Sequence, residues 1–163
     1  MKKSLLILFI STIACVKIGF AQTGRFSVFI YQPPEFFTKT DLPSGLQFKL
    51  SNNDTSFCII TLYKSQPAKD SVIHDVKSQW NEYVLNQLSK ADKKPARIYI
   101  QQMWDGWVST VAVGNFYQSK KKGVGMLSSF RKGKTSACVV YAFSDKNFKG
   151  VVDKFSKNLH LQK

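Results

Sequence analysis

The sequence is poor in the residues from which most metal and catalytic sites are built. Its 163 residues include two histidines, three cysteines and two glutamates, and no CxxC pattern, HExxH pattern or calcium-binding loop occurs. His74 falls in the first turn of an expected helix and His160 lies near the carboxyl end, both positions typical of surface histidines. These absences predict no metal site, no cofactor and no recognisable active site.

No apolar run is long enough to span a membrane. Residues 4–16 are thirteen positions without a charge, whereas a spanning helix needs about 20 apolar residues. Lys2 and Lys3 precede this stretch, and residues 19–21 (Gly-Phe-Ala) have small residues where signal peptidase requires them. We therefore expect residues 1–21 to be a cleaved signal peptide and the protein to be exported, to the periplasm or the cell exterior.

A second interpretation of the same segment remains open. Residues 12–15 read Thr-Ile-Ala-Cys, a degenerate form of the bacterial lipoprotein signal in which the cysteine is acylated. In that case the protein would be anchored to a membrane through lipid on Cys15.

Acidic residues are also scarce, with 10 Asp and Glu against 24 Lys and Arg. Removal of residues 1–21 takes away three lysines and leaves a net charge of +11. The remaining segment, residues 22–163, has the length of a single globular domain. A basic surface of this kind attracts polyanions such as anionic lipids, acidic glycans or nucleic acid.

Two cysteines, Cys58 and Cys138, remain after cleavage. An oxidising compartment permits a disulfide between them. Each cysteine, however, stands in an apolar run, where a free cysteine packs as a small hydrophobic residue. A disulfide and two buried thiols are both compatible with the sequence.

The hydrophobic pattern predicts strands followed by a helix, then four more strands and a last helix. Apolar residues recur at three and four positions within 71–90, which predicts an amphipathic helix capped by Asp70 or Ser71. Ser144 is expected to cap the last helix. The predicted strands cover residues 26–31, 46–50, 57–63, 97–104, 107–117, 124–130 and 135–143.

Asp105 and Gly106 separate two of these strands, and this dipeptide is a strong signal for a hairpin turn. The last four strands therefore form an antiparallel meander. Several strands are apolar on both alternating sets and need a layer on each face. The predicted fold is α+β, an antiparallel sheet with one amphipathic helix on each face.

Two features are candidates for a binding surface. Lysines cluster in two turns of the meander, and two tryptophans flank its hairpin turn. Aromatic residues so placed either line a ligand site or fill the core. The candidate binding residues are Trp104, Trp107, Lys120, Lys121, Lys122, Arg131, Lys132 and Lys134.

The element order resembles an uncharacterised group of exported bacterial proteins with a Mog1/PsbP-like fold. The resemblance spans residues 31–160 and rests on residues 59–63 (Ile-Ile-Thr-Leu-Tyr), 80–83 (Trp-Asn-Glu-Tyr), 105–107 (Asp-Gly-Trp) and 143–145 (Phe-Ser-Asp). It implies an α/β/α sandwich. Members of that fold class act mainly as binding or assembly modules, and none of their site residues matches a motif here.

The expected function is a non-enzymatic exported binding or assembly module with a basic surface. Its partner would be an envelope protein or a polyanion. The alternative is an envelope or extracellular hydrolase that uses His74 or Asp105 beside the tryptophans.

Overall fold

The computed structural model describes residues 23–53, 56–102, 104–118 and 121–162. The predicted signal peptide, with Cys15, lies outside the described residues, and so does Lys120. Of Trp104 only the backbone is described.

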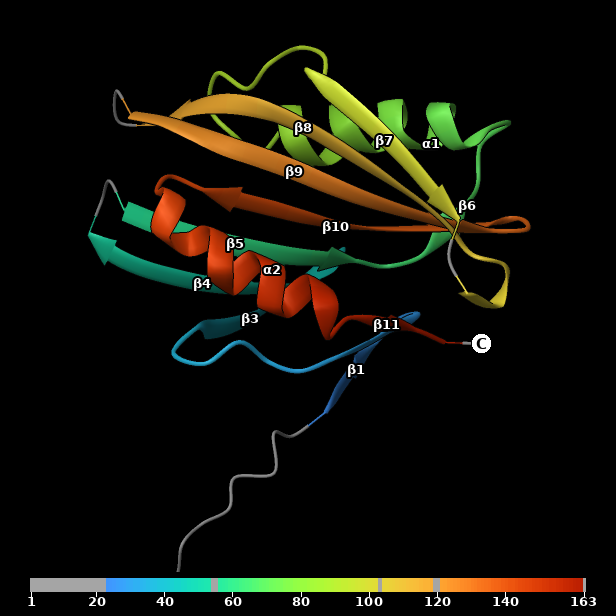
Figure 1. Ribbon diagram of the computed structural model, residues 1–163, viewed down its shortest axis with the longest axis horizontal. Helices are drawn as coiled ribbons and strands as arrows, with labels where there is room; N and C mark the ends of the chain where they lie inside the picture. Colours follow the sequence, from blue (N-terminus) through green and yellow to red (C-terminus); the bar gives the residue numbers. More distant parts are fainter. Residues whose placement is uncertain (1–22, 54–55, 103, 119–120, 163) are drawn as a thin grey trace, which may run out of the picture.

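An antiparallel sheet runs through the centre of the molecule (Figure 1). Its strands follow the order β3-β4-β5-β10-β9-β8-β7, and the short β6 pairs with β10. The bounds are β3 Thr38–Leu42, β4 Gly45–Asn53, β5 Ser56–Tyr63, β6 Gln66–Pro67, β7 Arg97–Gln102, β8 Val108–Gln118, β9 Lys121–Lys132 and β10 Thr135–Phe143.

The predicted meander is confirmed as β7-β8-β9-β10, with each strand antiparallel to the next. A short 3-10 turn, η2 (Trp104–Gly106), joins β7 to β8. Asp105 and Gly106 adopt φ of 63° and 77°, the left-handed conformation that the Asp-Gly pair tolerates.

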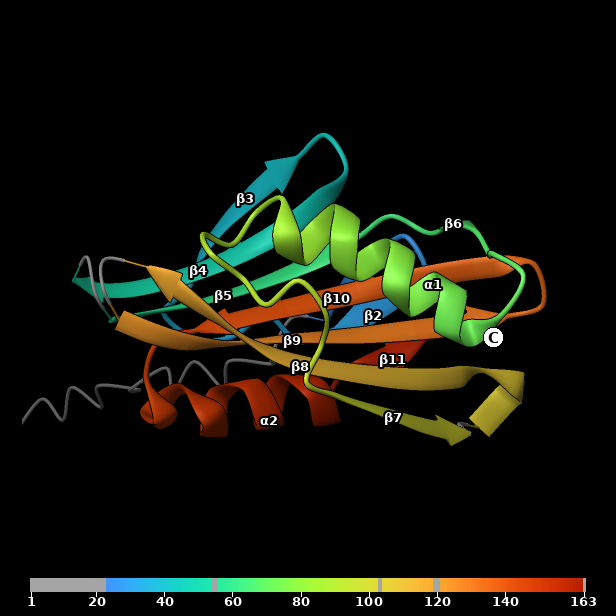
Figure 2. The same cartoon turned by 90° about the horizontal axis from the view of Figure 1, so that it is seen from above.

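Two helices cover opposite faces of the sheet, as predicted (Figure 2). On one face lie α1 (Val72–Gln79) and its continuation, the π-helix η1 (Trp80–Leu85); on the other lie η3 (Lys146–Phe148) and α2 (Lys149–Lys157). Each helix closes its own apolar core, with Trp80 and Val84 in one cluster and Val152 and Phe155 in the other. The α+β prediction is therefore correct.

The helix caps agree with the sequence in one case and differ in the other. Ser71 caps α1 because its Oγ accepts a hydrogen bond from the His74 N–H at 3.2 Å. The residue predicted to cap the second helix, Ser144, has another role. Its Oγ accepts a hydrogen bond from the Phe57 N–H of β5 at 2.9 Å. Asp145 takes the cap position, and its Oδ1 accepts from the Asn147 N–H at 2.8 Å.

A second, three-stranded sheet closes the α2 side of the core. It consists of β1 (Gly24–Phe26), β2 (Phe29–Tyr31) and β11 (His160–Leu161), in the order β1-β2-β11. The single strand predicted for residues 26–31 is thus wrong, because Ser27 adopts φ of 52° and turns the chain between β1 and β2.

Candidate functional site

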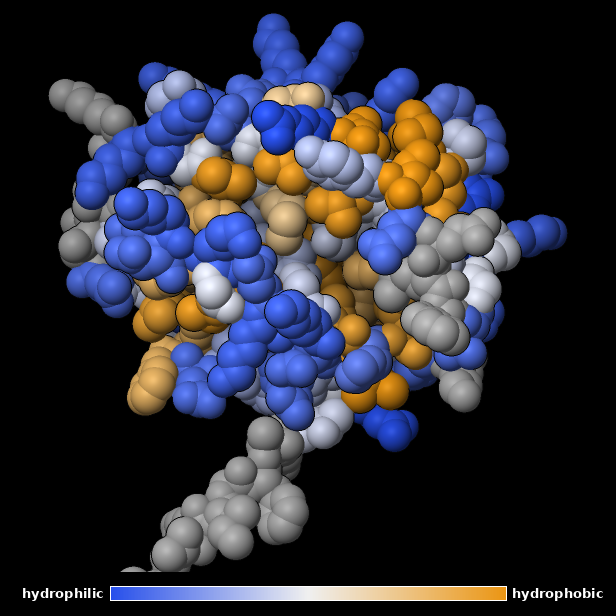
Figure 3. Space-filling view, in the orientation of Figure 1, coloured by the Kyte–Doolittle hydropathy of each residue, from blue (hydrophilic) through white to orange (hydrophobic). Residues whose placement is uncertain are grey.

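A groove lies on the α2 face of the sheet because α2 covers only part of that face. Val152 and Phe155 of α2, and Leu159 just after it, pack with core residues of β4, β5 and β10. The α2-facing side chains of β8 and β9 are left beside the helix. Figure 3 shows apolar side chains in the hollow between α2 and these strands.

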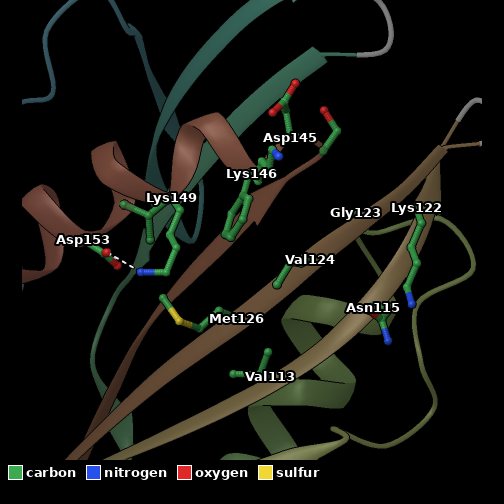
Figure 4. Close-up of a pocket in the computed structure, with 13 residues that line it drawn as sticks. Val113, Asn115, Lys122, Gly123, Val124, Met126, Asp145, Lys146, Lys149 and Asp153 are labelled. Atoms are coloured by element: carbon green, nitrogen blue, oxygen red, sulfur yellow. Dashed lines mark hydrogen bonds and ion pairs between the residues drawn. The ribbon is translucent and has the colours of Figure 1, made fainter.

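The larger of two cavities in the groove has a volume of about 600 Å³ and an apolar floor. Val113 of β8 and Val124 and Met126 of β9 form this floor, and Figure 4 shows them close together on the two neighbouring strands. They share a face because side chains alternate along a strand, and Val113 pairs directly with Met126. Phe143 and Val152 complete the apolar lining.

Charged side chains surround this floor. Lys149 donates to Asp153 Oδ2 at 2.6 Å, and the carboxylate of Asp145 is engaged as the helix cap. Lys122 and Lys146 also line the cavity, and neither has an ion pair among the residues described. With both carboxylates occupied, the mouth offers two free ammonium groups to a ligand.

The second cavity, of about 400 Å³, continues the groove and shares Met126 and Asp153 with the first. Its lining is more polar, with Ser128 on β9 and Ser156 on α2. Ser156 donates from Oγ to the Tyr141 hydroxyl at 3.0 Å, and burial raises the pKa of Tyr141 to about 12. This end of the groove therefore presents neutral hydrogen-bonding groups.

The predicted lysine clusters do not form one patch. Lys121 begins β9 and Lys132 ends it, and a strand of 12 residues at about 3.3 Å per residue separates them by roughly 36 Å. Of the predicted residues whose side chains the structure describes, Lys122 alone lines the larger cavity. Lys134 is exposed in the turn at the far end of β9.

Two other predicted residues have structural roles. Trp107 is buried in the core, and its Nε1 donates to the Gln162 carbonyl at 3.2 Å, so it is not a ligand wall. Lys132 lies over its ring at 6.0 Å. Arg131 donates to the buried carboxylate of Asp75 at 3.0 Å, on the α1 side of the sheet.

Cys58 and Cys138 are both free and buried, and the disulfide that the sequence left open is not formed. They belong to the two different core clusters, on opposite faces of the sheet. Burial raises the pKa of Cys58 to about 12 and that of Cys138 well above its usual value, so both thiols stay protonated.

The histidine of the hydrolase hypothesis lies away from the groove. His74 Nδ1 is 3.3 Å from Asp70 Oδ2 on the exposed first turn of α1, and neither cavity has a histidine among the described residues that line it. The described residues also contain no group of three His, Cys, Asp or Glu placed to hold a metal ion. No helix among them combines the length and apolarity needed to cross a bilayer.

No pattern in the sequence indicates the groove directly. Val113, Val124 and Met126 stand in apolar runs, and the pattern marks them only as buried strand positions. Lys146 and Lys149 look like an ordinary polar helix face. The groove arises because α2 is displaced toward one side of the sheet, which depends on tertiary packing.

Comparison with solved structures shows that the fold is a PsbP-like α+β fold. The solution structure of cyanobacterial PsbP (CyanoP) from Synechocystis sp. PCC 6803 matches with a TM-score of 0.59 at 10% identity, over 91% of this chain and 97% of that one. The resemblance expected from the element order is confirmed at the level of the fold.

A second solved structure, from Bacteroides thetaiotaomicron VPI-5482, matches with a TM-score of 0.52 at 11% identity. The match covers 83% of this chain and 46% of the other, so this chain spans about half the length of that protein. No protein-family model and no curated protein matches the sequence. At these identities the likeness establishes the fold and transfers no site residue.

Proposed function

We propose that this protein is an exported, non-enzymatic binding module and that the groove beside α2 is its ligand site. Residues 1–21 direct export to the periplasm or cell exterior, with lipidation at Cys15 as the alternative. The observation that carries the proposal is the apolar floor of the groove beside the unpaired ammonium groups of Lys122 and Lys146.

The groove favours a ligand with an apolar body and an anionic head. Val113, Val124 and Met126 offer apolar surface whose burial is worth about 25 cal/mol per Å². Lys122 and Lys146 supply the positive charge for the head, and the net charge of +11 that remains after removal of residues 1–21 attracts anions from a distance. Among the polyanions expected from the sequence, anionic lipid supplies both parts.

Calorimetric titration with single-chain amphiphiles tests this function. The probes have one alkyl chain and a carboxylate, phosphate, neutral sugar or ammonium head, each below its micelle concentration. We expect both anionic probes to bind more tightly than the neutral one and the ammonium probe to bind least. The carboxylate and phosphate arms distinguish a fatty acid from a phospholipid head.

Two variants separate the parts of the site. Lys122→Gln with Lys146→Gln should weaken the anionic probes about tenfold and leave the neutral probe unchanged, since each exposed charge contributes up to about 1 kcal/mol. Val113→Asp should weaken every probe. Lys134→Gln, a lysine outside the groove, is the control. Equal binding of all heads, or no binding of any probe, would contradict the proposal.

A further inference from the structure

The loop of residues 86–96 lies against the second half of β8 (Figure 2). Its Ser89 carbonyl accepts a hydrogen bond from the Tyr117 N–H at 3.1 Å. Further along, the Asp92 N–H donates to the Asn115 carbonyl at 2.8 Å. These bonds place the exposed lysines of the loop at the end of the main sheet where β8 stops and β9 starts.

Five exposed lysines gather at this end, and none of them has an ion pair among the residues described. We call them the lysine patch, and they are Lys90, Lys93, Lys94, Lys121 and Lys122. The carboxylate of the loop, Asp92, is engaged, because its Oδ2 accepts hydrogen bonds from the backbone and side-chain amides of Asn115 at 2.8 and 3.1 Å. The ammonium groups of the patch are therefore available to an outside partner.

The cations at the other end of β9 are used by the protein itself. Arg131 is bound to the buried carboxylate of Asp75, and Lys132 lies over the ring of Trp107. Their charge serves the packing of the core and of α1. The lysine patch has no such internal partner.

An exposed tyrosine lies within the patch. Tyr117 is 45% exposed and is the cross-strand neighbour of Lys122. Residues directly opposite in an antiparallel pair lie on the same face, so the ring and the ammonium group stand side by side. A tyrosine ring beside lysines is typical of a membrane interface, where the ring contacts the lipid and the hydroxyl stays in water.

The backbone at Lys90 indicates that this position favours charge over stability. Lys90 adopts φ of 49°, a left-handed conformation that asparagine and glycine adopt more readily than lysine. The residue is exposed, so packing does not require its side chain. Backbone conformations of this kind cost free energy and cluster at functional sites.

We propose that the lysine patch docks the protein on an anionic membrane, with the ammonium groups against lipid phosphates and Tyr117 at the level of the headgroups. Charge complementarity carries the proposal, because unpaired lysines near an anionic bilayer attract it strongly. Lysine binds as a point charge on a flexible stem, which suits mobile headgroups, whereas bidentate phosphate recognition favours arginine. A nucleic-acid strand would need several rings for base stacking, and the patch contains one.

The patch is continuous with the groove, since Lys122 belongs to both. A membrane holds anionic amphiphiles, so docking there brings the mouth of the groove to its ligand. This link rests on the proposed function of the groove. The docking itself depends on the patch alone.

Cosedimentation with vesicles tests the docking. The sample is the chain from Gln22, which contains every described element, and the vesicles are phosphatidylcholine with or without phosphatidylglycerol. We expect binding to the anionic vesicles alone, and loss of binding at high salt because counter-ions screen the lysines. Absence of binding, equal binding to both vesicles, or binding that salt does not weaken would overturn the proposal.

Two double variants with the same loss of charge locate the docking surface. Lys93→Gln with Lys94→Gln should weaken binding to anionic vesicles at least about tenfold, since each lysine near the surface contributes about fivefold. Lys69→Gln with Lys134→Gln, two exposed lysines at the other end of the sheet, should weaken it less than about twofold. Equal losses would show that net charge acts without a patch and would overturn the proposal.

Two single variants distinguish a membrane from a soluble polyanion. Tyr117→Ser should weaken vesicle binding severalfold and leave binding to heparin unchanged. Lys90→Asn should weaken vesicle binding in a domain at least as stable to urea as the wild type, because asparagine suits this backbone conformation. Heparin that binds more tightly than the anionic vesicles, or that needs Tyr117, would assign the patch to a soluble polyanion and overturn the inference.

A last comparison separates docking from the proposed function of the groove. Val113→Asp, in the floor of the groove, should lose the single-chain amphiphiles and keep vesicle binding. The Lys93→Gln, Lys94→Gln variant should show the reverse. Vesicle binding that disappears in a folded Val113→Asp variant would place the contact in the groove and overturn the docking surface. Normal vesicle binding by a protein that takes up no amphiphile would support docking and contradict the groove alone.

Discussion

Arg131 differs from the lysines near it because it is tied to a buried carboxylate. The side chain of Asp75 is 2% exposed and accepts hydrogen bonds from Arg131 Nη1 at 3.0 Å and from the Lys69 N–H at 2.6 Å. A buried carboxylate that loses its cationic partner is strongly unfavourable. At the residue scale, Arg131 therefore stabilises the packing of α1 on the sheet.

Arg131→Ala should lower the free energy of unfolding by about 2 kcal/mol. The loss stays below the range of about 3–5 kcal/mol for fully buried pairs because the Arg131 side chain is 22% exposed. Urea unfolding followed by circular dichroism measures it. Lys134→Ala, an exposed lysine of the same turn region, should change stability by less than about 0.5 kcal/mol. Equal effects of the two variants would contradict the structural role of Arg131.

At the scale of elements, the α1 layer depends on close approach to the sheet. Trp80, at the start of η1, lies over Gly114 of β8 and donates from Nε1 to the Asp92 carbonyl at 3.0 Å. A Cβ on Gly114 would stand 2.8 Å from Cζ2 of the Trp80 ring. The glycine is thus required by the space that the tryptophan occupies.

Gly114→Ala should destabilise the protein by about 1–3 kcal/mol because the added methyl overpacks this contact. Gly150→Ala is the matched control, since nothing lies within 4 Å of its Cβ position on α2. Alanine is a better helix former than glycine, so this control should raise the free energy of unfolding by about 0.5–1 kcal/mol. Unfolding midpoints in urea report both changes, and a Gly114→Ala variant as stable as the wild type would refute the packing argument.

Some of the helices and strands could be predicted from the sequence, and others could not. The strands of the meander, the Asp105-Gly106 turn and the two helices follow from local periodicity and turn chemistry, and the structure contains them. The strand β3 was missed because Thr38, Lys39 and Asp41 carry no apolar alternation. The pairing of β11 with β2 and the groove beside α2 depend on contacts between distant segments, which no local pattern records.

The whole molecule carries several buried groups that resist deprotonation. Burial raises the pKa values of Tyr141 and Cys58 to about 12, and it also raises those of Tyr63 and Tyr83. In the unfolded chain these groups lose their protons near 9 to 10. At a pH between the unfolded and the native pKa values, the unfolded state binds fewer protons than the native state. The free energy of unfolding therefore falls as pH rises through this range.

We therefore expect stability to decline from about pH 9 toward pH 12. Each group that is ionised only in the unfolded state contributes about 1.4 kcal/mol per pH unit. Urea midpoints measured across this range test the slope. Tyr141→Phe removes one such group and should make the decline shallower. A constant midpoint up to pH 11 would show that these hydroxyls and thiols are not protected as described.

The small sheet has a consequence for the order in which the chain folds. β11 adds to β2, and Gln162 donates from Nε2 to the Ser27 carbonyl, 135 positions earlier. A ribosome releases β2 long before β11, and the central pair β5–β10 also waits for a late segment. Both pairings can therefore form only after these late segments have emerged, so the small sheet and the centre of the main sheet are completed near the end of synthesis.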